Sequence, residues 1–258
     1  RKLKEVSFLF NAQLLGHQQI VINAIEKKDL GIIVAPPGSG KTIVGLKIIA
    51  DKKQPALIIT HRKQIADQWI ERIETFLGIP KNEIGKIGQG KTKIGKQITV
   101  AMIQSLSKEL EKPDTGKILN AFGTIIVDEC HHIPAETFRN AISKLQTFYL
   151  YGLTATPFRK YNDSKLIFIH LGEVIAEIKS NEISTSKRPK IIIRNTELDV
   201  PFNSKTDKFE TLSKILVHDS SRNKSILGDV INELQSDKKV VIITERKEHI
   251  DSLNQYLK

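Results

Sequence analysis

Short apolar runs alternate with amphipathic stretches through the first 175 residues of the chain. Several runs are apolar throughout, which is typical of strands covered on both faces. Between the runs, apolar residues recur at helical spacing, as at Ile65, Trp69 and Ile73. Strands that alternate with helices predict an α/β fold with a parallel sheet, whose ligands bind beyond the carboxyl ends of the strands. The predicted strands are residues 32–35, 57–60, 99–102, 125–128 and 149–153.

Beyond residue 180 the pattern changes. A polar segment at residues 181–190 predicts a linker. Apolar runs at 191–194 and 240–244 predict two more strands, and helical spacing predicts helices at 222–235 and 247–257. These pieces are too few for a second complete doubly wound domain.

The composition limits the class of protein. Of the 258 residues, 40% are hydrophobic and 27% charged, which argues against a mainly disordered chain. No apolar run approaches the ~20 residues that span a bilayer, so we expect no membrane partner. The formal net charge of +11 favours a polyanionic partner, most often nucleic acid. Cys130 is the only cysteine, which excludes an intrachain disulfide and favours the reducing cytoplasm.

The clearest chemical motif is Ala-Pro-Pro-Gly-Ser-Gly-Lys-Thr at residues 35–42, between a predicted strand and a predicted helix. Its glycines let successive backbone N–H groups point at phosphate oxygens, and the helix adds its positive N-terminal end. Lys41 should neutralise the β- and γ-phosphates, and the Thr42 hydroxyl should bind Mg²⁺. A plain Gly/Pro-rich turn is the alternative. The predicted nucleotide-binding residues of this loop are Pro37, Gly38, Ser39, Gly40, Lys41 and Thr42.

A second motif ends the apolar strand predicted at 125–128. Asp128 at a strand end can reach the metal beside the phosphate loop, and Glu129 is the candidate that polarises the attacking water. Zinc binding by Cys130, His131 and His132 is a competing hypothesis, but no second Cys/His pair lies at ligand spacing.

The third motif is Gly-Leu-Thr-Ala-Thr-Pro-Phe-Arg at residues 152–159. Thr154 and Thr156, at a strand end, could hydrogen-bond the acidic pair and sense the γ-phosphate. The same residues are also compatible with an ordinary strand exit. Because the other two motifs are present, we favour the hypothesis that Thr154 and Thr156 couple the state of the bound nucleotide to the rest of the protein.

In this order the three motifs resemble those of superfamily 2 helicases and translocases, with the acidic motif in its Asp-Glu-Cys-His form. They look most like the branch of xeroderma pigmentosum group B helicases and type III restriction motor subunits. The resemblance implies a RecA-like P-loop NTPase domain at residues 1–182, a linker at 183–190 and the start of a second RecA-like domain at 191–258. It also implies ATP and Mg²⁺ as cofactors, DNA rather than RNA as the partner, and room for partner subunits.

The resemblance assigns further residues. Gln18 matches the segment that reads adenine, whereas the residues just before it depart from its usual Arg-x-Tyr. Nucleic-acid contacts are implied at His61, Arg62, Gln104, Ser105 and Arg159. The basic segment 81–96 is either a flexible loop that contacts the phosphate backbone or a plain solvent-exposed loop. Trp69 is expected in the core rather than as a base-stacking platform.

The main hypothesis is therefore an ATP-dependent helicase or translocase. A nucleotide-dependent interaction module, or the motor subunit of a restriction or defence complex, is the alternative. A small-molecule kinase leaves the third motif unexplained, and a nuclease built on Asp163, Glu177 and Lys179 has only a loose pattern to support it. The family's last two motifs, including its arginines toward the γ-phosphate, are absent, so we expect a fragment that binds nucleotide but hydrolyses it poorly.

Overall fold

The computed structural model describes residues 2–133, 136–156, 164–179, 190–197, 203 and 208–256. The chain divides into two compact units, Arg1–Ser186 and Lys187–Lys258. The predicted linker at 183–190 lies outside the described residues except for Lys190. None of the helices in the described ranges is both long and apolar enough to cross a membrane.

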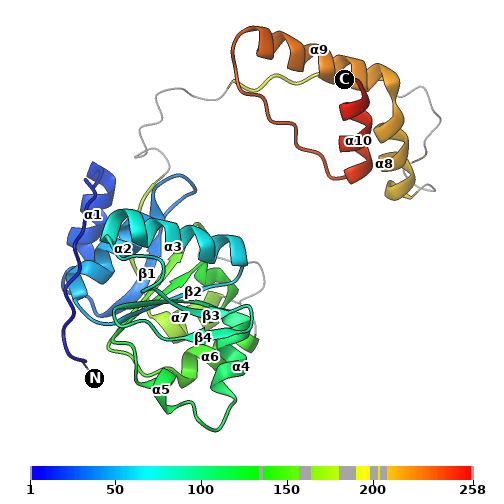
Figure 1. Cartoon of the computed structure of the whole chain (residues 1–258). Coiled ribbons are helices and arrows are strands. Elements are labelled where there is room, and N and C mark those ends of the chain that lie inside the picture. The colour runs from blue at the N-terminus through cyan, green and yellow to red at the C-terminus, as the bar shows by residue number, and fades with distance from the viewer. Residues whose placement is uncertain are drawn as a thin grey trace. The chain divides into compact units, whose positions relative to one another are not determined.

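The first unit is built on an eight-stranded sheet with the strand order β4-β3-β5-β2-β6-β7-β1-β8 (Figure 1). Neighbouring strands run parallel, apart from the antiparallel pair of β3 and β4. The strands are β1 (Leu30–Val34), β2 (Ala56–Thr60), β3 (Gly85–Gly88), β4 (Lys91–Lys93), β5 (Ile98–Met102), β6 (Thr124–Asp128), β7 (Tyr149–Thr154) and β8 (Val174–Glu177).

Helices cover both faces of this sheet (Figure 1). Alternate residues of β2 point to opposite faces: Ile58 joins the core formed with α1, α2 and α3, whereas Leu57 and Ile59 join the core formed with α4 to α7. The prediction of a parallel α/β sheet with helices on both faces is confirmed. The helices are α1 (Gly16–Ile25), α2 (Lys41–Lys52), α3 (Lys63–Leu77), α4 (Ile103–Leu110), α5 (Gly116–Leu119), α6 (Glu136–Lys144) and α7 (Ser164–Leu171), with a 3₁₀ turn at Cys130–His132.

The five strands predicted for this unit correspond to β1, β2, β5, β6 and β7, with ends that differ by one or two residues at most. The prediction of a flexible loop at residues 81–96 is wrong in part. The segment contains β3 and β4, which pair Gly88 with Lys91 across a two-residue turn and extend the sheet edge beyond β5. The lysine-rich composition of this hairpin suits an edge strand, where charged side chains remain in solvent.

The second unit contains α8 (Phe209–His218), α9 (Ser220–Gln235) and α10 (Lys247–Tyr256). The predicted helices at 222–235 and 247–257 match α9 and α10, with Leu257 outside the described residues, whereas α8 occupies a segment for which neither a helix nor a strand was predicted. The strands predicted at 191–194 and 240–244 do not form. Ile193 is 82% exposed and Ile243 is 91% exposed. A strand needs neighbours for its backbone hydrogen bonds, and neither segment has one in the described part of this unit.

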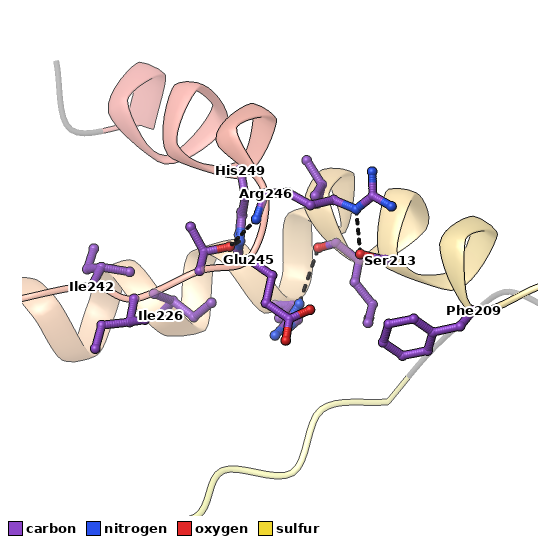
Figure 2. Close-up of a pocket in the computed structure, with 12 residues that line it drawn as sticks. Phe209, Ser213, Ile226, Ile242, Glu245, Arg246 and His249 are labelled. Atoms are coloured by element: carbon purple, nitrogen blue, oxygen red, sulfur yellow. Dashed lines mark hydrogen bonds between the residues drawn. The ribbon is translucent and has the colours of Figure 1, made fainter. Parts of the chain in front are cut away.

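A pocket in the second unit lies between α8, α9 and α10 (Figure 2). His249 of α10 contacts both α9 and the segment before α10. Its Nε2 lies 2.9 Å from Asn223 Oδ1, and its Nδ1 lies 2.9 Å from Thr244 Oγ1. Arg246 Nε donates to Ser213 Oγ at 2.5 Å. None of the residues predicted to bind nucleotide, metal or nucleic acid, or to couple them, lines this pocket, so the candidate site belongs to the first unit.

A close approach between helices α2 and α3 determines what can stand at position 45. A Cβ atom on Gly45 would lie 2.7 Å from Cη2 of the buried Trp69 ring. Ala is a better helix former than Gly, but here the overlap outweighs that preference, because the ring is rigid and fully enclosed.

We therefore expect Gly45→Ala to destabilise the protein by about 1–3 kcal/mol. Thermal unfolding followed by circular dichroism would check this, with a fall of about 2–4 °C per kcal/mol for a unit of this size. Gly116→Ala is the matched control, since nothing lies within 4 Å of its added Cβ. Equal melting temperatures for the two variants would contradict the steric argument.

Candidate functional site

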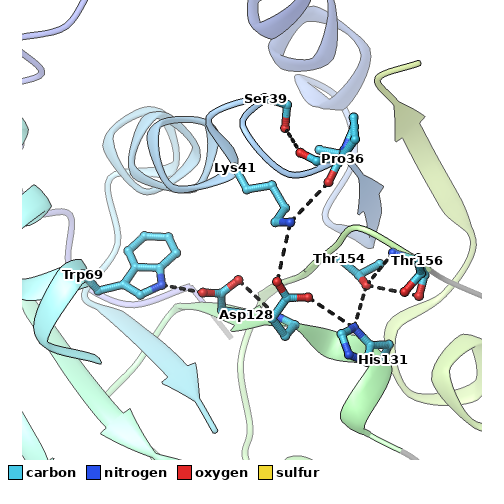
Figure 3. A network of polar contacts seen from close by, with 10 residues as sticks. Pro36, Ser39, Lys41, Trp69, Asp128, His131, Thr154 and Thr156 are labelled. Carbon is cyan, nitrogen blue, oxygen red and sulfur yellow. Dashed lines mark hydrogen bonds and ion pairs between the residues drawn. The ribbon is translucent and has the colours of Figure 1, made fainter. Parts of the chain in front are cut away.

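The three chemical motifs converge at one edge of the sheet. The phosphate loop follows β1, Asp128 ends β6 and Thr154 ends β7, and the order β6-β7-β1 makes these strands neighbours. Because all three run parallel, their carboxyl ends lie side by side. Figure 3 shows the polar contacts that result.

The phosphate loop has the backbone shape that its sequence predicts. Gly38 and Gly40 have φ angles of 80° and 82°, in the left-handed region that glycine adopts without steric cost. Ser39 is buried and its hydroxyl donates to the Pro36 carbonyl at 2.7 Å, while Pro37 is exposed. Helix α2 begins at Lys41, so its first backbone N–H groups face the end of the loop. This arrangement can bind an anion.

Lys41 connects the loop with the acidic motif. Its Nζ donates to the Ala35 carbonyl at 3.3 Å and lies 3.5 Å from Glu129 Oε1 (Figure 3). Thr42 follows in the first turn of α2 and is partly exposed. The Lys41 ammonium group thus lies between the segment predicted to bind phosphate and the segment predicted to polarise the attacking water.

Gln18 and His17, on α1, also reach the phosphate loop. Gln18 Nε2 donates to the Ser39 carbonyl at 2.9 Å, and its Oε1 accepts from Leu15 N at 2.9 Å. His17 Nε2 lies 3.2 Å from the same carbonyl. A Cβ on Gly40 would meet the Gln18 amide, so this glycine also makes room for α1. The segment predicted to read the base is therefore joined to the segment predicted to bind phosphate.

Asp128 is 7% exposed, and both of its carboxylate oxygens accept a hydrogen bond. Trp69 Nε1 donates to Oδ2 at 2.7 Å, and Glu129 N donates to Oδ1 at 3.0 Å (Figure 3). Burial raises the pKa of the Asp128 carboxyl above its ordinary value, and the hydrogen bond from Trp69 opposes that rise. The indole thus favours the charged form of a carboxylate that is largely shielded from water.

Glu129 has an unusual backbone and an unsatisfied side chain. Its φ of 50° lies in the left-handed region, which costs a non-glycine residue on the order of 1–3 kcal/mol. Oε2 is buried without a hydrogen bond from the described residues, although His131 Nδ1 lies 3.2 Å away. Strain and a buried, unsatisfied oxygen are both features that cluster at functional sites.

His131 connects the acidic motif with the third motif. Besides its contact with Glu129, His131 Nδ1 lies 2.9 Å from Thr154 Oγ1. The Thr154 hydroxyl in turn donates to the Thr156 carbonyl and accepts from the Thr156 N–H, each at 3.2 Å. The two threonines predicted for coupling are therefore joined to the acidic pair through a histidine. Residues 157–163, with Arg159 and Asp163, lie outside the described residues.

The donor set at this edge suits ATP with magnesium. The Thr42 hydroxyl and the Asp128 carboxylate are hard oxygen ligands, and Mg²⁺ usually takes one or two such groups together with substrate phosphates. Among the described residues, no group of three or more His, Cys, Asp or Glu could hold a metal ion unaided. Cys130 is fully buried, and that burial raises the pKa of its thiol far above the ordinary range, which disfavours the thiolate form.

Most of the predicted nucleic-acid residues gather at the neighbouring ends of β2 and β5. His61 and Arg62 follow β2, with Arg62 exposed at the N-terminus of α3. Gln104 is exposed in the first turn of α4 and donates to the His61 carbonyl at 3.4 Å. Ser105 follows it and is partly buried. The sheet order places these residues beside Asp128 at the end of β6.

Three histidines extend from this group to the acidic motif. The ring centroids of His61 and His132 are 4.3 Å apart, as are those of His132 and His131. Burial, together with the nearby Arg62 charge, lowers the pKa of His61 below its ordinary value and so favours its neutral form. No sequence pattern connects His61 with His132, because 71 positions separate them.

Trp69 is the residue whose role was underestimated from sequence. Its predicted place in the core is confirmed, since it is 1% exposed. Its hydrogen bond to Asp128 was not predicted. The available signal was chemical: a buried indole N–H usually has a hydrogen-bond partner, and the acidic motif supplies one.

The β3–β4 hairpin still allows the proposed phosphate contacts. Lys91, Lys93 and Lys96 are exposed, whereas Lys86 is paired with Asp67 at 3.4 Å. We expect that replacing the three exposed lysines by Ala flattens the plot of log affinity for DNA against log salt by about 0.7–0.9 for each phosphate that the variant no longer neutralises. Fluorescence anisotropy at several salt concentrations would measure the slope. An unchanged slope would leave the hairpin as a plain solvent-exposed edge.

Known proteins are similar to this chain in sequence. The family model described as "Type III restriction enzyme, res subunit" matches residues 11–159. A protein of Acanthamoeba polyphaga mimivirus, whose name is that of an ATP-dependent RNA helicase, is 29% identical over 96% of this chain and 49% of its own length. The DNA 3'-5' translocase XPB2 of Sulfurisphaera tokodaii is 31% identical over 79% of this chain and 44% of its own length. The chain thus spans about half the length of these curated relatives.

A solved structure shows the same fold. The helicase domain of Pyrococcus furiosus Hef superimposes with a TM-score of 0.56 at 19% identity, covering 93% of this chain and 52% of that one. The RecA-like fold predicted from the motifs is therefore confirmed.

Proposed function

Because the chain belongs to the family of the type III restriction enzyme res subunit, we propose that it is the ATP-binding part of a helicase or translocase. In this proposal, ATP hydrolysis at the phosphate loop drives movement along nucleic acid or its remodelling. The named activities of the relatives, an ATP-dependent RNA helicase and a DNA translocase, support it.

One observation carries the proposal: five neighbouring parallel strands end at one edge with complementary chemistry. The ends of β1, β6 and β7 carry the groups suited to a triphosphate and a water molecule. The ends of β2 and β5 carry the groups suited to a nucleic-acid strand. A small-molecule kinase would need the first set only.

The residues at the nucleotide half have distinct roles in this proposal. Backbone N–H groups of the loop and Lys41 bind the phosphates, while Thr42 and Asp128 hold Mg²⁺, which neutralises phosphate charge. Glu129 orients a water molecule and accepts its proton at a carboxylate oxygen. The buried, unsatisfied Oε2 of Glu129 is an acceptor that fits this role.

Coupling would pass through the contact between Glu129, His131 and Thr154. A change in charge or position at Glu129 acts on His131, which shares its Nδ1 between that carboxylate and the Thr154 hydroxyl. Thr154 is bonded in turn to Thr156 at the exit of β7. Closure of two domains on nucleotide would use this connection.

We take DNA as the first choice of substrate, since the translocase relative is named for DNA, and keep RNA as the second. We also propose that residues 191–258 begin a second RecA-like domain, which the separate compact unit Lys187–Lys258 supports. Partner subunits of a larger complex would fit the family's restriction enzymes.

The test is the ATPase rate of the complete protein with and without nucleic acid. The motor proposal expects the rate to rise on adding single- or double-stranded DNA or RNA, and the preferred polymer identifies the substrate. A rate that no nucleic acid changes would refute the motor and favour a nucleotide-dependent interaction module. Phosphoryl transfer to a small molecule would favour a kinase.

A further inference from the structure

Trp69 contacts more of the proposed nucleotide site than any sequence motif indicates. It lies in the second turn of α3, it is 1% exposed, and it is the only tryptophan of the chain. One edge of the ring lies against Gly45 of α2, the helix that begins with Lys41. Its Nε1 donates to Asp128 at the end of β6 (Figure 3). A single indole therefore contacts both α2 and β6.

The hydrogen bond fixes the direction of the Asp128 carboxylate. With Oδ1 bonded to Glu129 N at 3.0 Å and Oδ2 bonded to Trp69 Nε1 at 2.7 Å, the carboxyl plane is held at both oxygens. The backbone donor comes from the adjacent residue, so Trp69 supplies the only long-range hydrogen bond to this carboxylate among the described residues. Each oxygen keeps a second lone pair that can serve as a metal ligand.

Partners of this kind tune metal sites in general. Carboxylates that ligate metals are themselves hydrogen-bonded by outer residues, and removal of such a partner typically weakens metal binding by about 10–100-fold. The indole is well suited to the task because it donates only and cannot compete for the cation. A phenyl ring at the same position would fill most of the volume but would leave Oδ2 without its donor.

We propose that Trp69 is a positioning residue that holds the Asp128 carboxylate in the orientation required to bind the magnesium of the nucleotide. The inference rests on the proposed function, since it takes Asp128 to be the metal-binding acid. It differs from a packing role, which any large apolar side chain could fill.

The direct test is Trp69→Phe, with Ile73→Val as the matched control. Ile73 is fully buried one turn further along α3 and belongs to the same core. Mg²⁺ is titrated into protein that is saturated with the non-hydrolysable analogue AMP-PNP. Calorimetry then gives the Mg²⁺ concentration at which half of the total heat change has occurred. We expect this concentration to rise about 10–100-fold in Trp69→Phe and to stay near the wild-type value in Ile73→Val. Binding of AMP-PNP in EDTA should be equal in all three proteins.

A second measurement needs no substitution. Because Trp69 is the sole tryptophan, its fluorescence reports the field at Asp128, which a divalent cation would alter strongly at such short range. With AMP-PNP bound in EDTA, adding Mg²⁺ should change the emission over the same concentration range that calorimetry gives. Lys41→Ala, treated identically, should show no such change.

The outcomes separate the inference from the proposed function. Equal Mg²⁺ dependence of Trp69→Phe and Ile73→Val, or an emission that Mg²⁺ leaves unchanged while it strengthens nucleotide binding, would reduce Trp69 to packing. Failure of wild-type protein to bind AMP-PNP at all would instead refute the nucleotide site itself. If Trp69→Phe does not fold, the response of the wild-type emission to Mg²⁺ still tests the inference, because an unchanged emission would contradict it.

Discussion

Replacement of Lys41 by Ala should weaken ATP binding by roughly a hundredfold or more. The Lys41 amine is the one side-chain cation that contacts both the phosphate loop and the acidic motif in the described structure. Removing one partner of a desolvated charge pair costs about 2–5 kcal/mol. Lys41, whose side chain is 15% exposed, falls in that class, and isothermal calorimetry with Mg²⁺–ATP would measure the effect.

Lys47→Ala provides the control for this variant. Lys47 stands on the same helix and is paired with Asp51 rather than with the loop, so the substitution removes equal charge outside the site. Its ATP affinity should remain within about twofold of wild type, because an exposed pair contributes about 0–1 kcal/mol. Retained micromolar binding by Lys41→Ala would refute the phosphate-loop assignment.

Glu129→Gln should have the opposite profile: nucleotide still binds, but turnover falls by about 10²–10⁴-fold. The amide preserves the size of the side chain but cannot accept the proton of the attacking water. Binding survives because the loop and Asp128 remain intact, and without the carboxylate beside it the Lys41 amine is free for phosphate. Steady-state ATPase rates of the complete protein, together with calorimetry, would separate the two effects.

Glu136→Gln is the matched control, since Glu136 is exposed in the first turn of α6. It should hydrolyse ATP at the wild-type rate. Unchanged turnover in Glu129→Gln would remove Glu129 from its proposed role and leave its left-handed backbone as a feature of the turn alone.

The sheet could be predicted from sequence where local pattern and tertiary environment agree. Strands such as β2 and β6 are buried on both faces, so their residues are apolar without interruption. The chemical motifs were equally visible, because a phosphate loop needs consecutive residues in a fixed order. That the strand ends meet at one edge follows from parallel pairing, which the alternation of strands and helices already indicated.

The sequence-based predictions of secondary structure failed where pairing with a neighbouring strand determines the structure. The β3–β4 hairpin is rich in lysine and glycine, a composition typical of loops, yet β5 offers it a parallel edge to extend. Residues 191–194 and 240–244 have the converse problem: their composition favours strands, but no partner is described for them. Helix α8 was missed because the polar residues 203–208 that precede it concealed the apolar positions that follow.

The finest features of the site depend on contacts between distant positions. Trp69 and Asp128 are 59 residues apart, and no local pattern joins them. Sequence reasoning found the acid and found the core position, but only the folded chain shows that the second donates a hydrogen bond to the first.

The tight fit of Gly45 against Trp69 also links the evolutionary histories of two positions. A homologue that keeps the indole has no room for a side chain at 45, whereas one with a smaller residue at 69 gains that room and gives up the donor to Asp128. Substitutions at 45 and 69 should therefore arise together, and homologues with both changed would need another way to orient the acid at the end of β6.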